Sequence, residues 1–140
     1  MRTPMIAGNW KMHKGPSEAR TFALDLAGSL GRVRDVEVVV APPFVSLVPV
    51  REAIEGSPIK LCAQDVFWEN EGAFTGEISP LMLKDCGCTY VIIGHSERRT
   101  YFGETDETVN RKIRAALKAG LKAIVCVGER LEERLSLIHI

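Results

Sequence analysis

The sequence has 140 residues, of which 46% are hydrophobic and 26% are charged, a composition that supports one soluble domain with its own core and excludes a disordered chain. Lys and Arg total 18, and Asp and Glu also total 18, so the net charge of zero provides no general attraction to nucleic acid or to an anionic membrane. Any anion that binds must therefore be held by a local cluster of charges.

Neither an export signal nor a membrane span is predicted. The apolar stretch at residues 5–7 is interrupted at once by residues 8–11, too early for a signal peptide, so we expect a cytoplasmic protein. The longest apolar region, residues 38–50, contains several prolines and is shorter than the roughly 20 residues that a membrane helix needs.

Short β-branched runs alternate with longer amphipathic segments along the chain. Pro16 suits the first turn of the first helix, and Gly28 and Gly31 are expected to end that helix. In the last long helix, Leu117 is expected to face inward and Gly120 to form the C-cap. In chain order we expect strands at residues 5–8, 36–41, 59–63, 90–93 and 121–127, and helices at 16–29, 46–54, 80–85 and 105–119.

The uniformly apolar strands are typical of a parallel sheet whose two faces are covered, which gives an α/β fold. An open doubly wound sheet and a closed barrel both fit this class, but no glycine-rich phosphate loop follows the first strand. Five strands end by residue 127, so eight βα units would need about 250 residues, the usual size of a parallel (β/α)8 TIM barrel. We expect such a barrel, truncated here after about five strands, with uncovered strand edges.

Four cysteines raise the possibility of a metal site or of disulfides: Cys62, Cys86, Cys88 and Cys126. Cys86 and Cys88 are separated by a single residue, whereas zinc-binding pairs usually have about two to four residues between them. We therefore expect reduced thiols that pack as small apolar groups, and no metal site.

Polar side chains follow the first and fourth predicted strands. Asn9 and Lys11 follow the first, and His95, Ser96 and Glu97 follow the fourth. In a barrel the carboxyl ends of the strands meet on the face where catalysis takes place. An amide, an ammonium and an imidazole on that face suit a substrate that carries a carbonyl and an anionic group.

Each of these residues also has a structural interpretation. Asn9 can end a strand, Lys11 can be an ordinary solvated lysine, and His95 can belong to a helix cap with Ser96 as the N-cap. Glu97 can orient Lys11 or can pair with one of the two arginines that follow it.

Four ordered motifs resemble the triose-phosphate isomerase family: GNWKM at residues 8–12, the loop from Gln64 through GAFTGE, IIGHSERR at 92–99 and CVGE at 126–129. The resemblance extends over residues 4 to about 134. It divides the chain into residues 1–134, the N-terminal part of a single TIM-barrel domain, and an aberrant tail at 135–140, in which His139 has no expected role.

The resemblance implies interconversion of dihydroxyacetone phosphate and D-glyceraldehyde 3-phosphate through an enediolate, in glycolysis and gluconeogenesis, without a metal or other cofactor. In this family a neutral histidine acts as the electrophile beside a glutamate base, and His95 takes the histidine position. Lys11 is implied to supply positive charge and, with Asn9, to bind the small phosphorylated triose substrate. Glu97 is implied to orient Lys11, and Ser96 to support the site without touching the substrate.

The resemblance also implies a homodimer through the loop at residues 64–79, in which Thr75 contacts the neighbouring subunit. Phe67, Trp68 and Phe74 give this loop rings that need a surface to bury them. The alternative is that the loop folds back on its own barrel.

The family's catalytic base is a glutamate after a sixth strand, and Glu129 does not match it because Glu129 follows the fifth strand. We therefore expect these residues alone to lack isomerase activity, since deprotonating the substrate needs a positioned base. The alternative function is a non-catalytic interaction protein that associates through its exposed strand edges.

Overall fold

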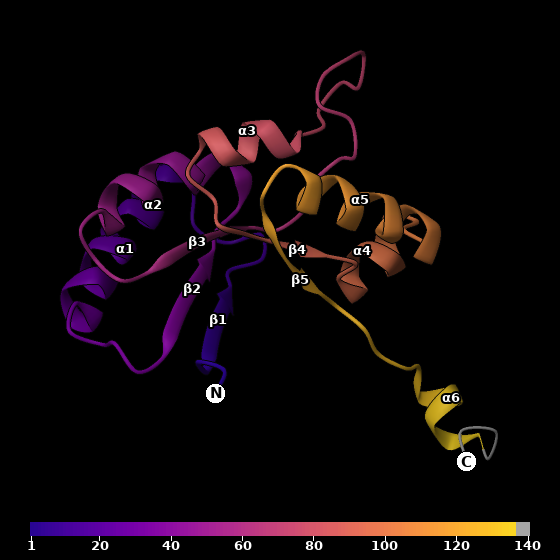
Figure 1. The fold of residues 1–140 in the computed structure, drawn as a ribbon, viewed down its shortest axis with the longest axis horizontal. Helices are drawn as coiled ribbons and strands as arrows, with labels where there is room; N and C mark the ends of the chain where they lie inside the picture. The colour runs from indigo at the N-terminus through magenta and orange to yellow at the C-terminus, as the bar shows by residue number, and fades with distance from the viewer. Residues whose placement is uncertain (137–140) are drawn as a thin grey trace.

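The computed structural model describes residues 1–136, so most of the expected tail, including His139, lies outside the described residues. Strands and helices alternate along the chain (Figure 1). Among the described helices, none combines the length and the apolar character needed to cross a membrane. The elements are β1 Met5–Asn9, α1 Pro16–Leu30, β2 Glu37–Ala41, the 3-10 helix η1 Phe44–Ser46, α2 Leu47–Ile54, β3 Lys60–Ala63, α3 Pro80–Asp85, β4 Tyr90–Ile93, α4 Ser96–Tyr101, α5 Asp106–Lys118, β5 Lys122–Val125 and α6 Leu131–Leu135.

The described strands form one parallel sheet in the order β1-β2-β3-β4-β5, so each strand pairs with the next one in the chain. The sheet curls, and Figure 1 shows the helices around its outside from α1 at the left to α5 at the right. This arrangement confirms the expected fold class, because it is the strand order of a (β/α)8 barrel over its first five strands.

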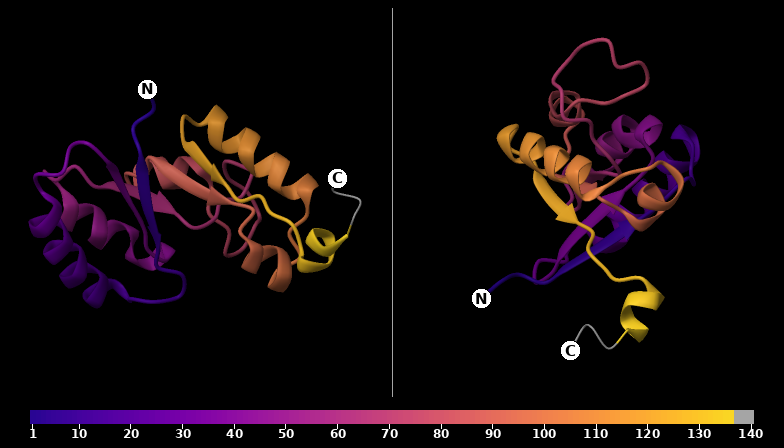
Figure 2. Two further views of the ribbon diagram at one scale, coloured as in Figure 1. Left: turned by 90° about the horizontal axis from the view of Figure 1, so that it is seen from below. Right: turned by 90° about the vertical axis from the view of Figure 1, so that its right-hand side faces the viewer.

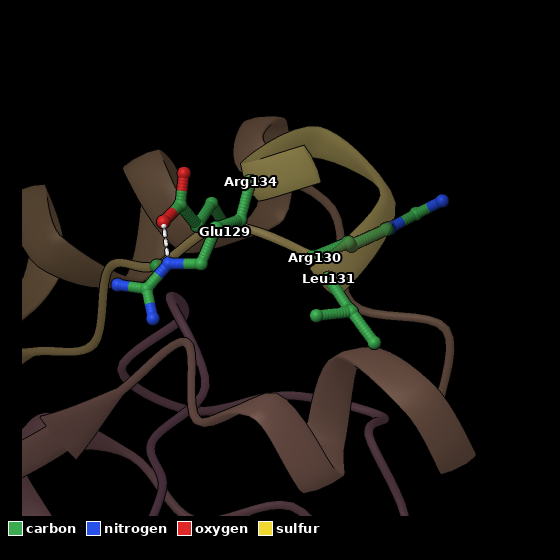
Figure 3. A pocket seen from close by; sticks show the side chains of 5 residues that line it. Glu129, Arg130, Leu131 and Arg134 are labelled. Carbon is green, nitrogen blue, oxygen red and sulfur yellow. Dashed lines mark hydrogen bonds and ion pairs between the residues drawn. The ribbon is translucent and has the colours of Figure 1, made fainter. Parts of the chain in front are cut away.

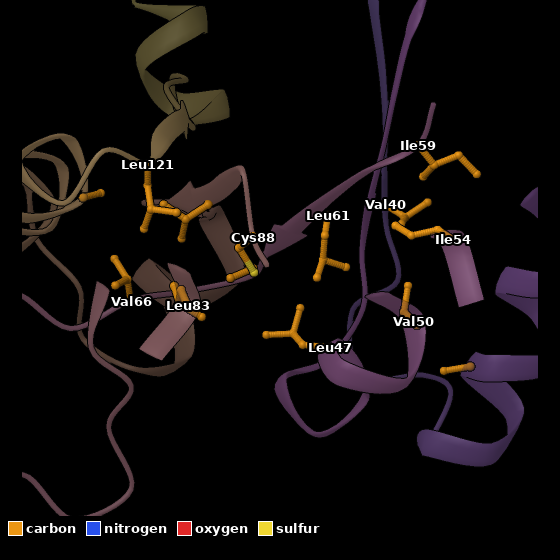
Figure 4. Packing of buried hydrophobic residues seen from close by; sticks show 14 of the residues in the cluster. Val40, Leu47, Val50, Ile54, Ile59, Leu61, Val66, Leu83, Cys88 and Leu121 are labelled. Atoms are coloured by element: carbon orange, nitrogen blue, oxygen red, sulfur yellow. The ribbon is translucent and has the colours of Figure 1, made fainter. Parts of the chain in front are cut away.

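The alternation of side chains along each strand builds two separate cores. Val40 and Leu61 point outward and pack with Val50 and other residues of the helices (Figure 4). Val39 and Cys62 point the other way, into the curl of the sheet, where they pack with the neighbouring strands. Both faces of the middle strands are therefore apolar, as the sequence predicts.

The first and last strands are less covered than the middle ones. Ile6 of β1 is 66% exposed, and Val127, just after β5, is 89% exposed. In the described part of the chain, these strands are the two edges of the sheet, so the expected uncovered apolar edges are present.

Several predicted boundaries were wrong. Gly28 lies inside α1, and only Gly31 caps it. Ala119 is the C-cap of α5, and Gly120, with φ 85°, follows the cap in the left-handed conformation that favours glycine. The short helix α6 was not predicted, and α4 was anticipated only through the interpretation of Ser96 as a helix N-cap, because one or two turns are too short to show an amphipathic repeat.

The inward face of α5 also differs from the prediction. Leu117 is 58% exposed, whereas Lys112 is buried, with 4% exposure. Val109, Lys112 and Ala116 share the buried face, because residues three, four and seven apart stack on one side of a helix. A buried lysine on this face requires charged partners.

Lys112 is the centre of a buried ion cluster. Its ammonium lies 2.8 Å from the Asp65 carboxylate and also contacts Glu104. Arg98 of α4 lies 3.2 Å from both of these carboxylates. Two cations therefore match two anions, and the cluster joins Asp65, the second residue after β3, to Glu104, α4 and α5.

Removing the Lys112 charge should destabilise the fold strongly. Lys112→Met retains an apolar stem but leaves two carboxylates beside a single guanidinium. Breaking a buried pair in this way should lower the free energy of unfolding by about 3–5 kcal/mol. Urea unfolding monitored by circular dichroism measures the change. Arg111→Met, which removes an exposed α5 ion pair with Glu107, is the control and should cost about 1 kcal/mol or less. Equal losses in the two variants would show that the cluster contributes no more than a surface pair.

Candidate active site

The segment after β1 holds Lys11 in an unusual backbone conformation. Asn9 is the last residue of β1, and its Oδ1 accepts a hydrogen bond of 2.9 Å from the Lys11 backbone N–H. This turn places Lys11 at φ 53°, in the left-handed region that residues with a Cβ rarely adopt. The local bond is typical of asparagine, whose short side chain can replace a backbone acceptor in a turn.

The turn after β4 places His95. Gly94 has φ 77°, and a Cβ on it would lie 3.1 Å from Val109 and 3.2 Å from Arg99, so both conformation and space require glycine. Arg99 fixes the same turn, because its Nε donates to the Gly94 carbonyl at 3.0 Å. His95 then becomes the N-cap of α4.

The N-cap contact determines which nitrogen of His95 carries a proton. The Glu97 backbone N–H donates to His95 Nδ1 at 3.1 Å, so Nδ1 acts as an acceptor. In the neutral imidazole the proton is then on Nε2, which is left as a hydrogen-bond donor. The cap residue is thus His95 itself, and Ser96, the N-cap in the alternative structural interpretation, is instead the first residue of α4.

Lys11 and Glu97 form an ion pair across the mouth of the curled sheet. Lys11 Nζ lies 2.6 Å from Glu97 Oε1, which resolves the alternative pairings of Glu97 with Arg98 or Arg99. The hydrogen bond from Lys11 lowers the pKa of the Glu97 carboxyl. Both side chains are about half exposed, at 52% and 42%, so solvent screens their attraction.

Contacts therefore link four of the predicted site residues in one continuous series: Asn9 to Lys11, Lys11 to Glu97, and Glu97 to His95. Ser96 is adjacent but exposed. Thr75 is not part of this arrangement; it lies exposed in the loop between β3 and α3.

Sequence reasoning missed Gln64, which follows β3. Its Nε2 donates to the carbonyl oxygens of Lys11 and Ala41, each at 2.8 Å. Its position just past a strand end, like that of Asn9, was the available signal.

Among the described residues no group of three or more His, Cys, Asp or Glu side chains is arranged to hold a metal. Burial raises the pKa of the Cys88 thiol to about 12, which fits a packed, protonated side chain.

The loop between β3 and α3 projects away from the sheet in both Figure 1 and Figure 2. Its base is closed by a 2.8 Å hydrogen bond from Phe67 N–H to the Ile78 carbonyl. The Phe67 ring packs against Trp68 and Phe74, with ring centroids 4.2 and 4.7 Å away. The aromatic residues thus stiffen the loop, and Phe74 remains 42% exposed.

A separate cavity lies after β5 (Figure 3), lined by Gly128, Glu129, Arg130, Leu131 and Arg134. Glu129 Oε1 accepts from Arg134 Nε at 2.6 Å. Glu129 is therefore engaged with a guanidinium in this cavity, and it takes no part in the contacts that connect Asn9 to His95.

Comparison with known proteins identifies a single family. The family model for triosephosphate isomerase matches residues 4–139. The triosephosphate isomerases of Geobacter metallireducens and Carboxydothermus hydrogenoformans are each 62% identical over 134 residues, and that of Pelobacter propionicus is 60% identical. Each alignment covers 96% of this chain and 53% of the relative, so the chain spans about half the length of these curated relatives.

The Lys11–Glu97 pair predicts a specific titration. The pKa of Glu97 should lie below the ordinary glutamate value, so the ion pair is complete above that ordinary value and is lost as the pH falls through the lowered one. Carboxyl-carbon NMR titration measures this pKa. Lys11→Met should raise it to the ordinary value, whereas Lys14→Met, which removes an exposed pair with Glu18, should not change it. An unchanged Glu97 pKa in Lys11→Met would contradict the pairing.

Proposed function

The chain belongs to the triosephosphate isomerase family, and from this premise we propose that the protein interconverts dihydroxyacetone phosphate and D-glyceraldehyde 3-phosphate. The observation that carries the proposal is the connected arrangement of Asn9, Lys11, Glu97 and His95 at the carboxyl ends of β1 and β4. The reaction belongs to glycolysis, and the proposal places it in the cytoplasm.

In the proposed reaction His95 acts as a neutral electrophile. A base removes a proton from the carbon beside the substrate carbonyl, and negative charge develops on the carbonyl oxygen of the enediolate. His95 Nε2–H donates a hydrogen bond to that oxygen, because Nδ1 is already occupied by the Glu97 backbone N–H. A donor aimed at developing charge stabilises the transition state more than the ground state.

Lys11 supplies the positive charge of the site. Its ammonium is held by Glu97 and is half exposed, so it can contact the phosphate and the enediolate. Asn9 fixes the turn that presents this lysine, and its amide lies on the same rim of the sheet. The proposed ligand is therefore a small anion that carries a carbonyl, and no cofactor takes part.

We further propose that residues 1–140 by themselves do not catalyse the isomerisation. A general base needs a pKa near the working pH. The pKa of Glu97 is lowered by its hydrogen bond with Lys11, which makes its carboxylate a weaker base. Glu129 pairs with Arg134 in the cavity after β5. The alternative function, a non-catalytic interaction protein, is favoured by the exposed apolar side chains of β1 and of the segment after β5.

A chimera tests the proposed roles. Residues 1–134 joined to the remaining half of the Geobacter metallireducens relative should give an active isomerase, measured by a coupled assay. His95→Gln and Lys11→Met should each lower kcat by roughly 10²–10³-fold, the usual loss when one stabilising group is removed. Lys14→Met, in the same loop, is the control and should leave kcat unchanged. An active chimera that tolerates His95→Gln would overturn the assigned role, and turnover by residues 1–140 alone would overturn the proposed inactivity.

We also propose that the protein forms a homodimer through the loop at residues 64–79. The stacked rings of Phe67, Trp68 and Phe74 give the loop a fixed shape, and the exposed part of Phe74 offers apolar surface near Thr75. A projecting, ordered loop with exposed aromatic surface suits a protein interface. This supports the assignment of Thr75 to a contact with the partner subunit.

The chimera should sediment as a dimer, and Thr75→Glu should weaken it. A carboxylate desolvated in the contact without a partner should raise the dissociation constant at least roughly tenfold, equivalent to about 1.4 kcal/mol. Sedimentation equilibrium gives the constant. Thr21→Glu adds the same charge on the exposed surface of α1 and should leave it unchanged. Equal dimer strength in both variants would place the interface elsewhere.

A further inference from the structure

The loop between β1 and α1 contains two lysines with left-handed backbones: Lys11 at φ 53° and Lys14 at φ 70°. A residue other than glycine in such a conformation is strained, and the conformation persists only where the surroundings hold it. The loop therefore needs fixed contacts at both positions.

The ion pair of Lys11 is a weak restraint on its backbone. The pair with Glu97 is half exposed, so solvent screens the attraction between the two charges. The Asn9–Lys11 hydrogen bond lies within the loop itself, so it shapes the turn without attaching it to the rest of the protein. The attachment must come from another element.

Gln64 provides this attachment for Lys11. Its two Nε2 protons go to two acceptors, the carbonyl oxygens of Lys11 and Ala41, each 2.8 Å away. Since both partners are carbonyl oxygens, only one orientation of the amide group is possible. The Ala41 oxygen also accepts the Trp10 N–H at 3.0 Å, which extends the pairing of β1 with β2. Gln64 thus ties the Lys11 backbone to the end of the sheet.

Ser46 provides the matching contact for Lys14. Its side chain is completely buried, and its Oγ donates to the Lys14 carbonyl at 2.7 Å. Ser46 comes from η1, after β2, whereas Gln64 follows β3. Each positive-φ lysine therefore has its carbonyl held by one side chain from a different neighbouring βα segment.

We propose that Gln64 is the positioning residue of Lys11: by holding the Lys11 carbonyl it keeps the left-handed turn that presents the ammonium to Glu97. Ser46 holds Lys14 independently and closes the other end of the loop. The catalytic consequence rests on the proposed function, but the positioning does not. It is therefore tested on residues 1–140 by a structural measurement that needs no substrate or turnover.

The test is NMR spectroscopy of the isotope-labelled chain and of two variants, Gln64→Leu and Ser46→Ala. An intraresidue NOE between amide proton and Hα is strong only at positive φ, so it reports Lys11 and Lys14 separately. Gln64→Leu should weaken this signal at Lys11 and keep it at Lys14, and Ser46→Ala should do the reverse. Gln64→Leu should also raise the pKa of Glu97 toward the ordinary glutamate value, a change that loss of packing elsewhere would not produce.

Retention of both the Lys11 signal and the lowered Glu97 pKa in Gln64→Leu would overturn the proposal. If a variant does not fold, the unaltered chain still decides the question, because Gln64 is the only glutamine in the sequence and its amide signals are unambiguous. Its side-chain protons should exchange with water more slowly than those of the exposed Asn70. Equal exchange rates would contradict the two hydrogen bonds and with them the proposed role.

Discussion

The contact between Lys11 and Glu97 depends on the curl of the parallel sheet. β1 and β4 are separated by β2 and β3, so three inter-strand steps of about 4.8 Å would place their ends about 14 Å apart in a flat sheet. Lys11 Nζ nevertheless lies 2.6 Å from Glu97 Oε1. The curl brings the two strand ends toward each other, and the long lysine side chain spans the remaining distance. The curl of the sheet is thus part of what assembles the site.

The electrostatics of the site follow from this contact. The Glu97 carboxylate accepts a hydrogen bond from Lys11, and the Glu97 backbone N–H donates one to His95, so one residue contacts both the ammonium and the imidazole. In the proposed function, these groups stabilise negative charge on the substrate. A carboxylate with a lowered pKa is poorly suited to remove a proton from carbon, which agrees with the proposed role of Glu97 in orienting Lys11.

The sequence alone was sufficient to predict the structural features that repeat along the chain. Apolar runs predict the strands, and their order with the helices predicts the parallel sheet. Asn9, Lys11 and His95 were predicted because polar groups directly follow apolar strands. Buried Lys112 and the attachment made by Gln64 were not, because their partners lie 47 and 53 residues away in sequence and no local pattern encodes such contacts. Asn9 and Lys11 are two residues apart, and this spacing indicates that a local hydrogen bond between them is possible. No sequence spacing indicates that Gln64 also forms a hydrogen bond with Lys11.

The two residues after β3 connect the two halves of the site. Gln64 holds the Lys11 carbonyl, whereas Asp65, the next residue, lies 3.2 Å from Arg98 and 2.8 Å from buried Lys112. Arg98 directly follows Glu97 in α4. One dipeptide therefore contacts the backbone that carries the cation and the helix that carries its carboxylate partner. These contacts restrain both partners from the same strand end, whereas the ion pair itself is exposed and weak. The hydrogen bonds of Gln64 and the ion cluster around buried Lys112 thus support a geometry that the surface charges alone do not hold.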